Sequence, residues 1–255
     1  ITLNTYSATP QRLARANELA YMEELHQSAM NAAIAAIELA QRSDVLIAGC
    51  LPPLVASYRA DVSPSFKESL SSYRQLVELQ APASDVFICE TMSSISEATA
   101  ACTAGLESGQ PVWVALTVSD TEAGKLRGGE SLSAAVNALE TLGADAILLN
   151  CSQPEAISAS WEQLRDSKAK FGAYANGFVS VAPLYPGGTV DELEARQDVN
   201  PQQYAEHALK WIRGGASIVG GCCEISPAHI KAVHEKLVKE GFALSTKAPS
   251  EALGG

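Results

Sequence analysis

The order of secondary structure is clearest between residues 132 and 168, which read LSAAVNALETLGADAILLNCSQPEAISASWEQLRDSK. The short apolar run 146–150 is predicted to be a strand, and helical patterns flank it at 132–142 and 154–168. Pro154 suits the first turn of the second helix, and Ser152 ahead of it is a candidate cap. A short strand between two helices indicates parallel pairing with its neighbours.

The same alternation runs through the whole chain. Strands are predicted at 1–4, 45–49, 86–90, 112–118, 146–150, 171–176 and 217–220, and helices at 19–42, 65–80, 94–108, 132–142, 154–168, 201–213 and 227–240. Seven such units are one short of a closed eight-fold barrel, and the sequence opens directly on the strand-like Ile1-Thr2-Leu3. We therefore expect an α/β fold, a (β/α)8 TIM barrel, with its first strand missing from this chain. Residues 1–244 should form this single domain, followed by a C-terminal tail at 245–255.

Composition favours small-molecule chemistry. The chain has 255 residues, a formal net charge of -11 and basic residues scattered along its length, so no basic patch for nucleic acid or an anionic membrane is predicted. Its apolar stretches fall short of the roughly 20 residues a membrane span needs. Six cysteines without a secretory segment favour a reducing compartment. We expect a cytoplasmic protein, a monomer or small homo-oligomer, with small-molecule substrates.

Cysteines stand at the ends of two predicted strands. Gly220-Gly221-Cys222-Cys223 follows the last strand, and Cys151 follows the run 146–150. The glycines permit the bend that two adjacent cysteines need to reach one metal. Three thiolates with an open fourth position are typical of a catalytic zinc site. Cysteine also serves as a small buried hydrophobe, the role expected of Cys50, Cys89 and Cys102.

Further candidates follow from the rule that catalytic groups of such barrels lie at the carboxyl ends of the strands. Asn4, Glu90 and Asn176 all occupy strand ends. Side-chain alternation places Glu90 and Cys89 on opposite faces, and we expect Glu90 to face inward and to bind a cation such as an amino-acid ammonium. A structural role for Glu90, as a helix cap or a partner for lysine, is the alternative.

Two other functions remain open for a barrel with these residues. A zinc site could be structural or thiol-sensing, in which case four protein ligands would normally close it. The pairs Gly187-Gly188 and Gly220-Gly221 also fall where barrels often bind phosphate, which would make the protein a phosphate-binding enzyme.

Four motifs in order resemble those of the homocysteine S-methyltransferase family. They are Asn4-Thr5-Tyr6, Glu90-Thr91, Asn150-Cys151 and Gly220-Gly221-Cys222-Cys223. The resemblance spans nearly the whole chain and implies a zinc-dependent barrel that methylates homocysteine to methionine. It implies Cys151, Cys222 and Cys223 as zinc ligands, Glu90 as the partner of the substrate amino group, and Asn176 as occupant of the fourth zinc position before homocysteine arrives. The family's first strand carries an Asp-Gly-Gly-like element that this sequence does not match.

The methyl donor is predicted from the aromatic content. Quaternary ammonium donors usually require an aromatic cage. The chain has three tryptophans and seven tyrosines, of which Tyr6, Tyr58 and Tyr185 are expected near the barrel mouth, and they do not form an evident cage pattern. We therefore expect a sulfonium donor, S-methylmethionine or S-adenosylmethionine.

Overall fold

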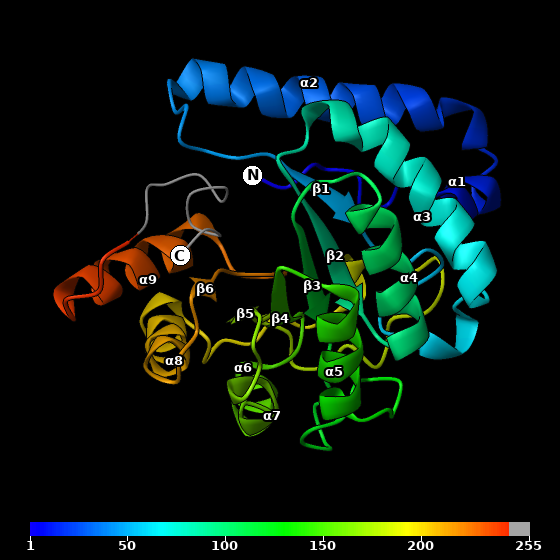
Figure 1. Cartoon of the computed structure of the whole chain (residues 1–255). Coiled ribbons are helices and arrows are strands. Elements are labelled where there is room, and N and C mark those ends of the chain that lie inside the picture. Colours follow the sequence, from blue (N-terminus) through cyan, green and yellow to red (C-terminus); the bar gives the residue numbers. More distant parts are fainter. Residues whose placement is uncertain (245–255) are drawn as a thin grey trace.

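Six parallel strands form one sheet at the centre of the molecule (Figure 1). The computed structural model describes residues 1–244, and each strand pairs with the next in chain order. The strands are β1 Ala48–Leu51, β2 Val86–Met92, β3 Val112–Leu116, β4 Ala146–Asn150, β5 Lys170–Tyr174 and β6 Ile218–Val219. At least one α-helix connects each pair of successive strands, which confirms the predicted α/β class with parallel pairing.

Helices pack on the outside of this sheet, with α3, α4 and α5 side by side along one face (Figure 1). The α-helices are α1 Pro10–Arg15, α2 Met22–Ala40, α3 Phe66–Gln80, α4 Ile95–Leu106, α5 Leu132–Leu142, α6 Pro154–Ala159, α7 Glu162–Arg165, α8 Pro201–Arg213 and α9 Pro227–Lys239. Short 3-10 turns lie at η1 Leu19–Tyr21, η2 Ala60–Val62, η3 Ala81–Ala83 and η4 Val190–Glu192. Within residues 1–244, no helix has both the length and the apolar character that crossing a membrane requires.

Local hydrogen bonds correct two predicted helix boundaries. The helix predicted at 154–168 breaks into α6 and α7, and at the break the Ser160 hydroxyl accepts a hydrogen bond from the backbone N–H of Gly124. Ser152 is not the cap of α6, since Gln153 holds that position and the Ser152 hydroxyl accepts from the N–H of Val118 instead. The predicted cap Asn200 does accept hydrogen bonds from the first turn of α8.

The segment at residues 1–4 forms a single bridge where a strand was predicted. Leu3 N–H donates to Ala48 O at 2.9 Å and Ala48 N–H donates to Ile1 O at 2.8 Å, which extends the sheet by one short edge beside β1. Within the described residues β6 pairs only with β5, so the sheet is open between β6 and this segment. Closure by an eighth strand stays a prediction.

The two faces of the sheet have different environments. Phe87 and Cys89 of β2 are fully buried in the main core under the helices. Ile88 and Glu90 point to the opposite, concave face, where both line a small cavity. The structure thus places Glu90 inward and Cys89 outward, as the alternation predicts.

Glu97, in the first turn of α4, makes the free energy of unfolding depend on pH. Only 3% of this residue is exposed, and its carboxylate accepts hydrogen bonds from the Ser63 hydroxyl and the Ser93 N–H. Burial raises the pKa of Glu97 to about 6. Because the folded-state pKa exceeds the unfolded one, this group's contribution to stability is full below about pH 4.5 and is lost as the pH rises through about 6.

We expect Glu97→Gln to remove this pH dependence of the free energy of unfolding. The amide stays neutral, so the free energy of unfolding of the variant relative to wild type should rise by ~2 kcal/mol between pH 4.5 and pH 7.5. Urea unfolding at the two pH values measures the difference. The matched control is Glu78→Gln on the exposed side of α3, which should follow the wild-type profile. Parallel profiles for wild type and Glu97→Gln would refute the assignment.

Candidate metal and substrate site

Three cysteines meet at the carboxyl end of the sheet. Cys151 directly follows β4, and Cys222 and Cys223 follow β6 after two glycines. The Cys151 Sγ atom lies 2.8 Å from that of Cys222 and 3.8 Å from that of Cys223, and the Cys222 and Cys223 Sγ atoms are 3.9 Å apart. The predicted convergence of the three sulfurs is confirmed, and the group is compact enough to hold one metal ion.

The backbone around the cysteines adopts unusual conformations. Cys151 has φ 48° and Glu224 has φ 64°, both in the left-handed region that side chains other than glycine rarely occupy. Gly221 is also required for space, because a Cβ there would collide with the side chain of Ile225. The sequence therefore places the cysteines on a tight turn of fixed shape.

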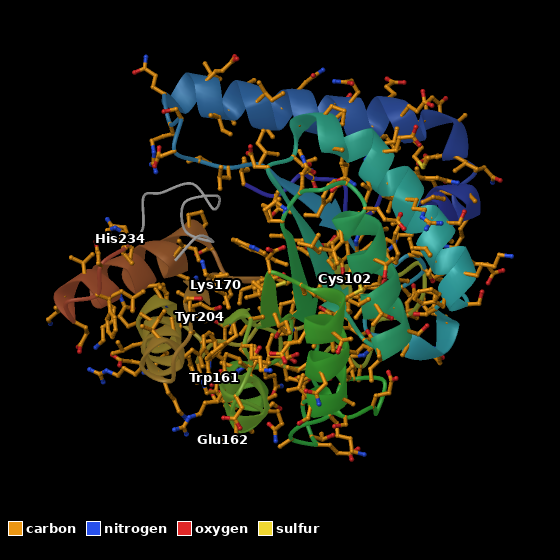
Figure 2. The ribbon with its side chains drawn as sticks, in the orientation of Figure 1. Cys102, Trp161, Glu162, Lys170, Tyr204 and His234 are labelled. Atoms are coloured by element: carbon orange, nitrogen blue, oxygen red, sulfur yellow. The ribbon has the colours of Figure 1, made fainter. Side chains whose placement is uncertain are left out.

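Tyr204 of α8 fixes the spacing of the strand ends that carry the site. Its hydroxyl donates to Gly220 O at 2.7 Å and accepts from Ala175 N–H at 3.0 Å. The ring of Tyr204, which Figure 2 labels, is fully buried and packs edge-on against Trp211, and Trp211 in turn stacks on Trp161. The ends of β5 and β6 are thus held together by a side chain from outside the sheet.

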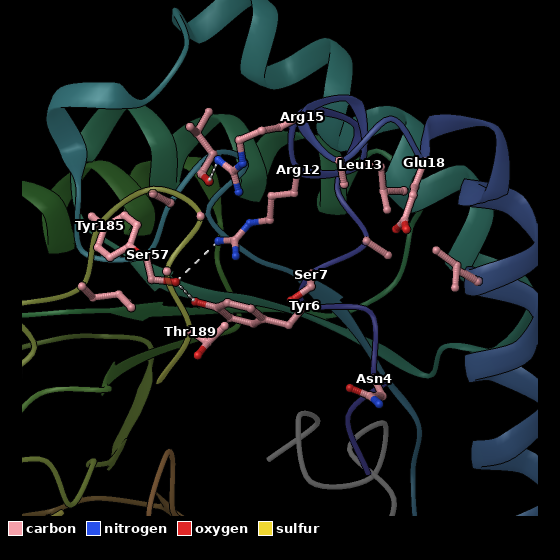
Figure 3. A pocket seen from close by; sticks show the side chains of 18 residues that line it. Asn4, Tyr6, Ser7, Arg12, Leu13, Arg15, Glu18, Ser57, Tyr185 and Thr189 are labelled. Carbon is pink, nitrogen blue, oxygen red and sulfur yellow. Dashed lines mark hydrogen bonds between the residues drawn. The ribbon is translucent and has the colours of Figure 1, made fainter. Parts of the chain in front are cut away.

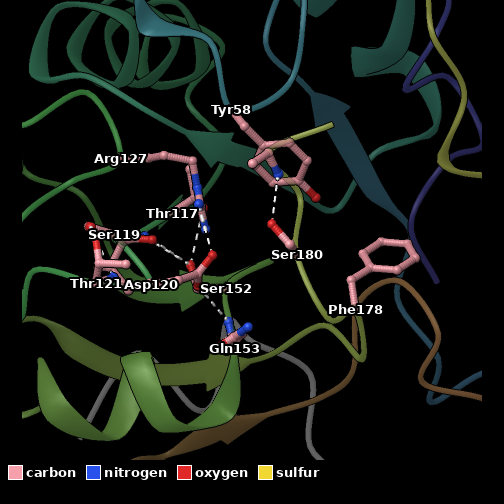
Figure 4. Close-up of polar contacts among 12 residues, drawn as sticks. Tyr58, Thr117, Ser119, Asp120, Thr121, Arg127, Ser152, Gln153, Phe178 and Ser180 are labelled. Carbon is pink, nitrogen blue, oxygen red and sulfur yellow. Dashed lines mark hydrogen bonds and ion pairs between the residues drawn. The ribbon is translucent and has the colours of Figure 1, made fainter. Parts of the chain in front are cut away.

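Tyr58 reaches the cysteines from the loop after β1. Its hydroxyl lies 3.0 Å from the Cys151 Sγ, and the residue has φ 66°. The Arg127 guanidinium stacks over the Tyr58 ring at 5.2 Å and pairs with Asp120 at 2.9 Å (Figure 4). Asp120 also accepts from the N–H of Gln153, two residues after Cys151. This chain of contacts orients both Tyr58 and the turn that carries Cys151.

The three thiols of the cluster differ in pKa. Contacts from Cys151 and Cys222 lower the pKa of Cys223, whereas contacts with Cys151 and Cys223, together with burial, raise the pKa of Cys222. Cys50, Cys89 and Cys102 are buried elsewhere, Cys102 on α4 (Figure 2), and burial raises the pKa of each thiol. They do not belong to the cluster.

Glu90 is a half-buried carboxylate without a hydrogen-bond partner among the described residues. It lines a cavity of about 170 Å³ on the concave face, together with Trp113, Tyr174 and Gly221. Burial raises its pKa to about 7, and the charge of Cys223 adds to the rise. A cationic ligand would relieve both effects, so the environment suits the predicted binding of an ammonium group.

Asn176 lies between the two cysteine segments. Its backbone N–H donates to Ser152 O, and the N–H of the next residue, Gly177, donates to Cys223 O. The side-chain oxygen accepts from Phe178 N–H at 3.3 Å, and the buried Nδ2 has no partner within residues 1–244. Asn176 therefore presents an unused donor beside the cysteines. Asn4 is exposed and lines a different, larger cavity.

The long segment after β5 covers the cluster. Phe178, Val181 and Leu193 are buried against Cys151 and Tyr58, and Cys222 and Cys223 pack at the edge of this group. An isolated bridge between Phe178 and Ala195 closes the segment on itself. The segment thus buries Cys151, whereas Cys222 and Cys223 stay partly exposed at its edge.

This arrangement agrees with comparisons to known proteins. The sequence matches the homocysteine S-methyltransferase family model over residues 1–237. The chain belongs to the homocysteine S-methyltransferase family. Among relatives, it is 29% identical over 226 residues to the S-methylmethionine–homocysteine S-methyltransferase of Pongo abelii, covering 80% of this chain and 58% of the relative. It is 28% identical over 231 residues to the homocysteine S-methyltransferase of Escherichia coli, covering 82% and 68%.

A solved member of the homocysteine S-methyltransferase family shares the fold. The metallated form of the Escherichia coli homocysteine methyltransferase superposes with a TM-score of 0.74 at 23% identity, covering 92% of this chain and 78% of that one. The chain spans 58% of the length of the first curated relative and 10% of the mycobacterial methionine synthases it also matches. The family and the barrel-type fold predicted from sequence are thereby confirmed.

Sequence reasoning missed two parts of this family member's site. Helix α1 was not predicted, although Thr9 followed by Pro10 is a recognisable helix start, and its Arg12 and Arg15 face a cavity. Arg127 was also missed, because its link to Tyr58 depends on a distant loop and left no local signal.

Proposed function

We propose that this protein transfers a methyl group from a sulfonium donor to the thiol of homocysteine, giving methionine, with zinc as its cofactor. The convergence of the Cys151, Cys222 and Cys223 sulfurs at the carboxyl end of a parallel sheet carries this proposal. Membership of the homocysteine S-methyltransferase family supports it independently.

The chemistry of the donor set fits zinc. Three cysteine sulfurs would hold the ion, and within residues 1–244 no fourth cysteine, histidine, aspartate or glutamate joins them. A site with three protein ligands and an open position is typical of catalytic zinc, whereas four protein ligands are typical of structural zinc. When bound, zinc deprotonates a coordinating thiol at neutral pH.

The protein groups around the cysteines would bind and orient homocysteine. Glu90 would pair with its ammonium group, which returns the carboxyl to its charged form. Asn176 Nδ2 would donate a hydrogen bond to the substrate, since amide oxygen, not nitrogen, ligates metals and the oxygen already accepts from Phe178. The covering segment with Phe178, Val181 and Leu193 would keep water away from the reacting sulfur.

Methyl transfer then proceeds as a direct displacement at the methyl carbon. The homocysteine sulfur, having lost its proton, forms a bond to the methyl carbon while the bond from that carbon to the donor sulfonium breaks. The electron pair of the broken bond stays on the donor, which leaves as a neutral thioether. One face of the Tyr6 ring and one face of the Tyr58 ring already hold the guanidinium groups of Arg12 and Arg127, at 5.3 and 5.2 Å, which disfavours a quaternary ammonium cage built from these rings.

The test combines a metal assay with product analysis. Protein purified with zinc should bind about one ion and should form methionine from homocysteine with S-methylmethionine or S-adenosylmethionine, and not with betaine. Chelation should abolish product formation, and added zinc should restore it. One bound zinc without methionine from any of the three donors would instead favour a structural or thiol-sensing site.

A further inference from the structure

A second, larger cavity lies beside the cysteine site, and the function proposed above does not use it. It has a volume of about 540 Å³ and lies between α1, the segment after β1 and the segment that covers the cysteines. Figure 3 shows the arginines of α1 on one side of it and Tyr185 and Thr189 on another. Glu90 does not line this cavity but the smaller one on the concave face, so the two cavities are separate.

The two arginines in this cavity differ from all others in the chain. Seven of the nine arginines have a carboxylate oxygen within 4.0 Å among the described residues: Arg42, Arg59, Arg74, Arg127, Arg165, Arg196 and Arg213. Arg12 and Arg15 do not, although the chain carries a net charge of -11. Two uncompensated cations three positions apart on one helix attract an anion.

Their hydrogen bonds leave donors free. Arg12 donates from Nε and Nη2 to Pro53 O and from Nη2 to the Ser57 hydroxyl, and its Nη1 has no partner within the described residues. In the described part of the chain, the side chain of Arg15 donates only from Nη1, to Val55 O at 3.4 Å. Burial lowers the pKa of Arg12, and the charge of Arg15 lowers it further. A guanidinium with unused N–H groups suits bidentate binding of a carboxylate.

The cavity adjoins the sulfurs through two tyrosines. The Tyr6 hydroxyl, at the cavity wall, lies 2.9 Å from that of Ser57, and the next residue, Tyr58, contacts Cys151. Ser57, which Tyr6 contacts, and Tyr58, which contacts Cys151, are consecutive residues, so the cavity wall and the cluster are joined by one short stretch of chain. A molecule anchored on the arginines would point its other end toward the cysteines.

We propose that Arg12 and Arg15 bind the carboxylate of the methyl donor, and that the donor is therefore a sulfonium amino acid of the S-methylmethionine type. This inference rests on the proposed function. Glu18 on the cavity lining offers a partner for the donor ammonium. Gly187 lies beside Arg15, where a Cβ would come within 3.8 Å of Nε, so the pair Gly187-Gly188 borders the same anion subsite.

The experiment compares S-methylmethionine with its methyl ester, which lacks the negative charge. Arg15→Gln is the main variant because Arg15 is exposed and its loss leaves the fold intact; Arg12→Gln is the second. We expect Arg15→Gln to raise the KM for S-methylmethionine about 10-fold and to leave the KM for the ester and for homocysteine unchanged. Arg42→Gln, which removes a solvent-exposed arginine paired with Asp44, is the matched control and should change none of these values.

Calorimetric binding of S-methylmethionine separates this inference from the proposed function. Arginine-dependent binding without methyl transfer would support the subsite and refute the proposed function. Methyl transfer with an unchanged donor KM in both variants, or a raised homocysteine KM, would overturn the subsite. Binding of inorganic phosphate without binding of S-methylmethionine would also overturn it, in favour of a phosphate ligand.

Discussion

Replacing Cys223 by alanine should abolish metal binding and methyl transfer together. Cys223 Sγ lies within 3.9 Å of both other sulfurs, so its loss leaves two ligands for the ion. Because disturbing residues behind metal ligands already costs about 10- to 100-fold, loss of a ligand should reduce activity by more than about 100-fold. Bound zinc is measured by elemental analysis and activity by methionine formation from homocysteine.

Cys102→Ala is the matched control for this experiment. Cys102 is fully buried in α4, outside the cluster, so its replacement removes a cysteine without touching the site. The control should keep one zinc per chain even if its unfolding midpoint falls. Retention of zinc and activity by Cys223→Ala, with the fold intact by circular dichroism, would contradict the assignment of the three-sulfur site.

Glu90→Gln should raise the KM for homocysteine and leave the zinc content unchanged. The half-buried carboxylate has no partner within residues 1–244, so an ammonium that binds it gains a charge-assisted hydrogen bond. Such bonds contribute about 1.5–3 kcal/mol, and the amide retains little of this, so the KM should rise about 10- to 100-fold. Initial rates at saturating donor measure the effect.

An acceptor without the amino group tests whether Glu90 acts by binding the ammonium group of homocysteine. 4-Mercaptobutyrate carries the thiol and carboxylate of homocysteine but no ammonium, so wild type and Glu90→Gln should use it with similar KM. An equal rise in KM for both acceptors would show that Glu90 supports the cavity rather than the ammonium.

Much of the site could be predicted from the direction of the parallel strands and the alternation of their side chains. Side chains that end parallel strands gather at one edge, so Cys151 and Cys222 could be placed together although 71 positions separate them. Alternation along β2 likewise placed Glu90 inward, because Cys89 must then enter the apolar core. These inferences need only the direction and period of the strands.

Features that depend on loops could not be predicted in the same way. The left-handed backbone at Tyr58 brings its hydroxyl to Cys151, and no local pattern signals that contact across 93 positions. The unpaired state of Arg12 and Arg15 is likewise a property of their surroundings. Sequence shows which residues carry charge, but only the packed chain shows which charges lack a partner.

The dependence of the metal site on Tyr204 bears on how natural variants of this chain should be interpreted. Strand β6 is only two residues long, and a hydroxyl from α8 ties its end to that of β5. A Tyr204→Phe allele would look conservative, since the aromatic ring remains. It would nevertheless remove both side-chain hydrogen bonds at the strand end that presents Cys222 and Cys223, and leave the backbone bonds from Gly220 N–H to Ala173 O and from Cys222 N–H to Ala175 O to hold that end, so such an allele should be assayed for bound metal as well as for stability.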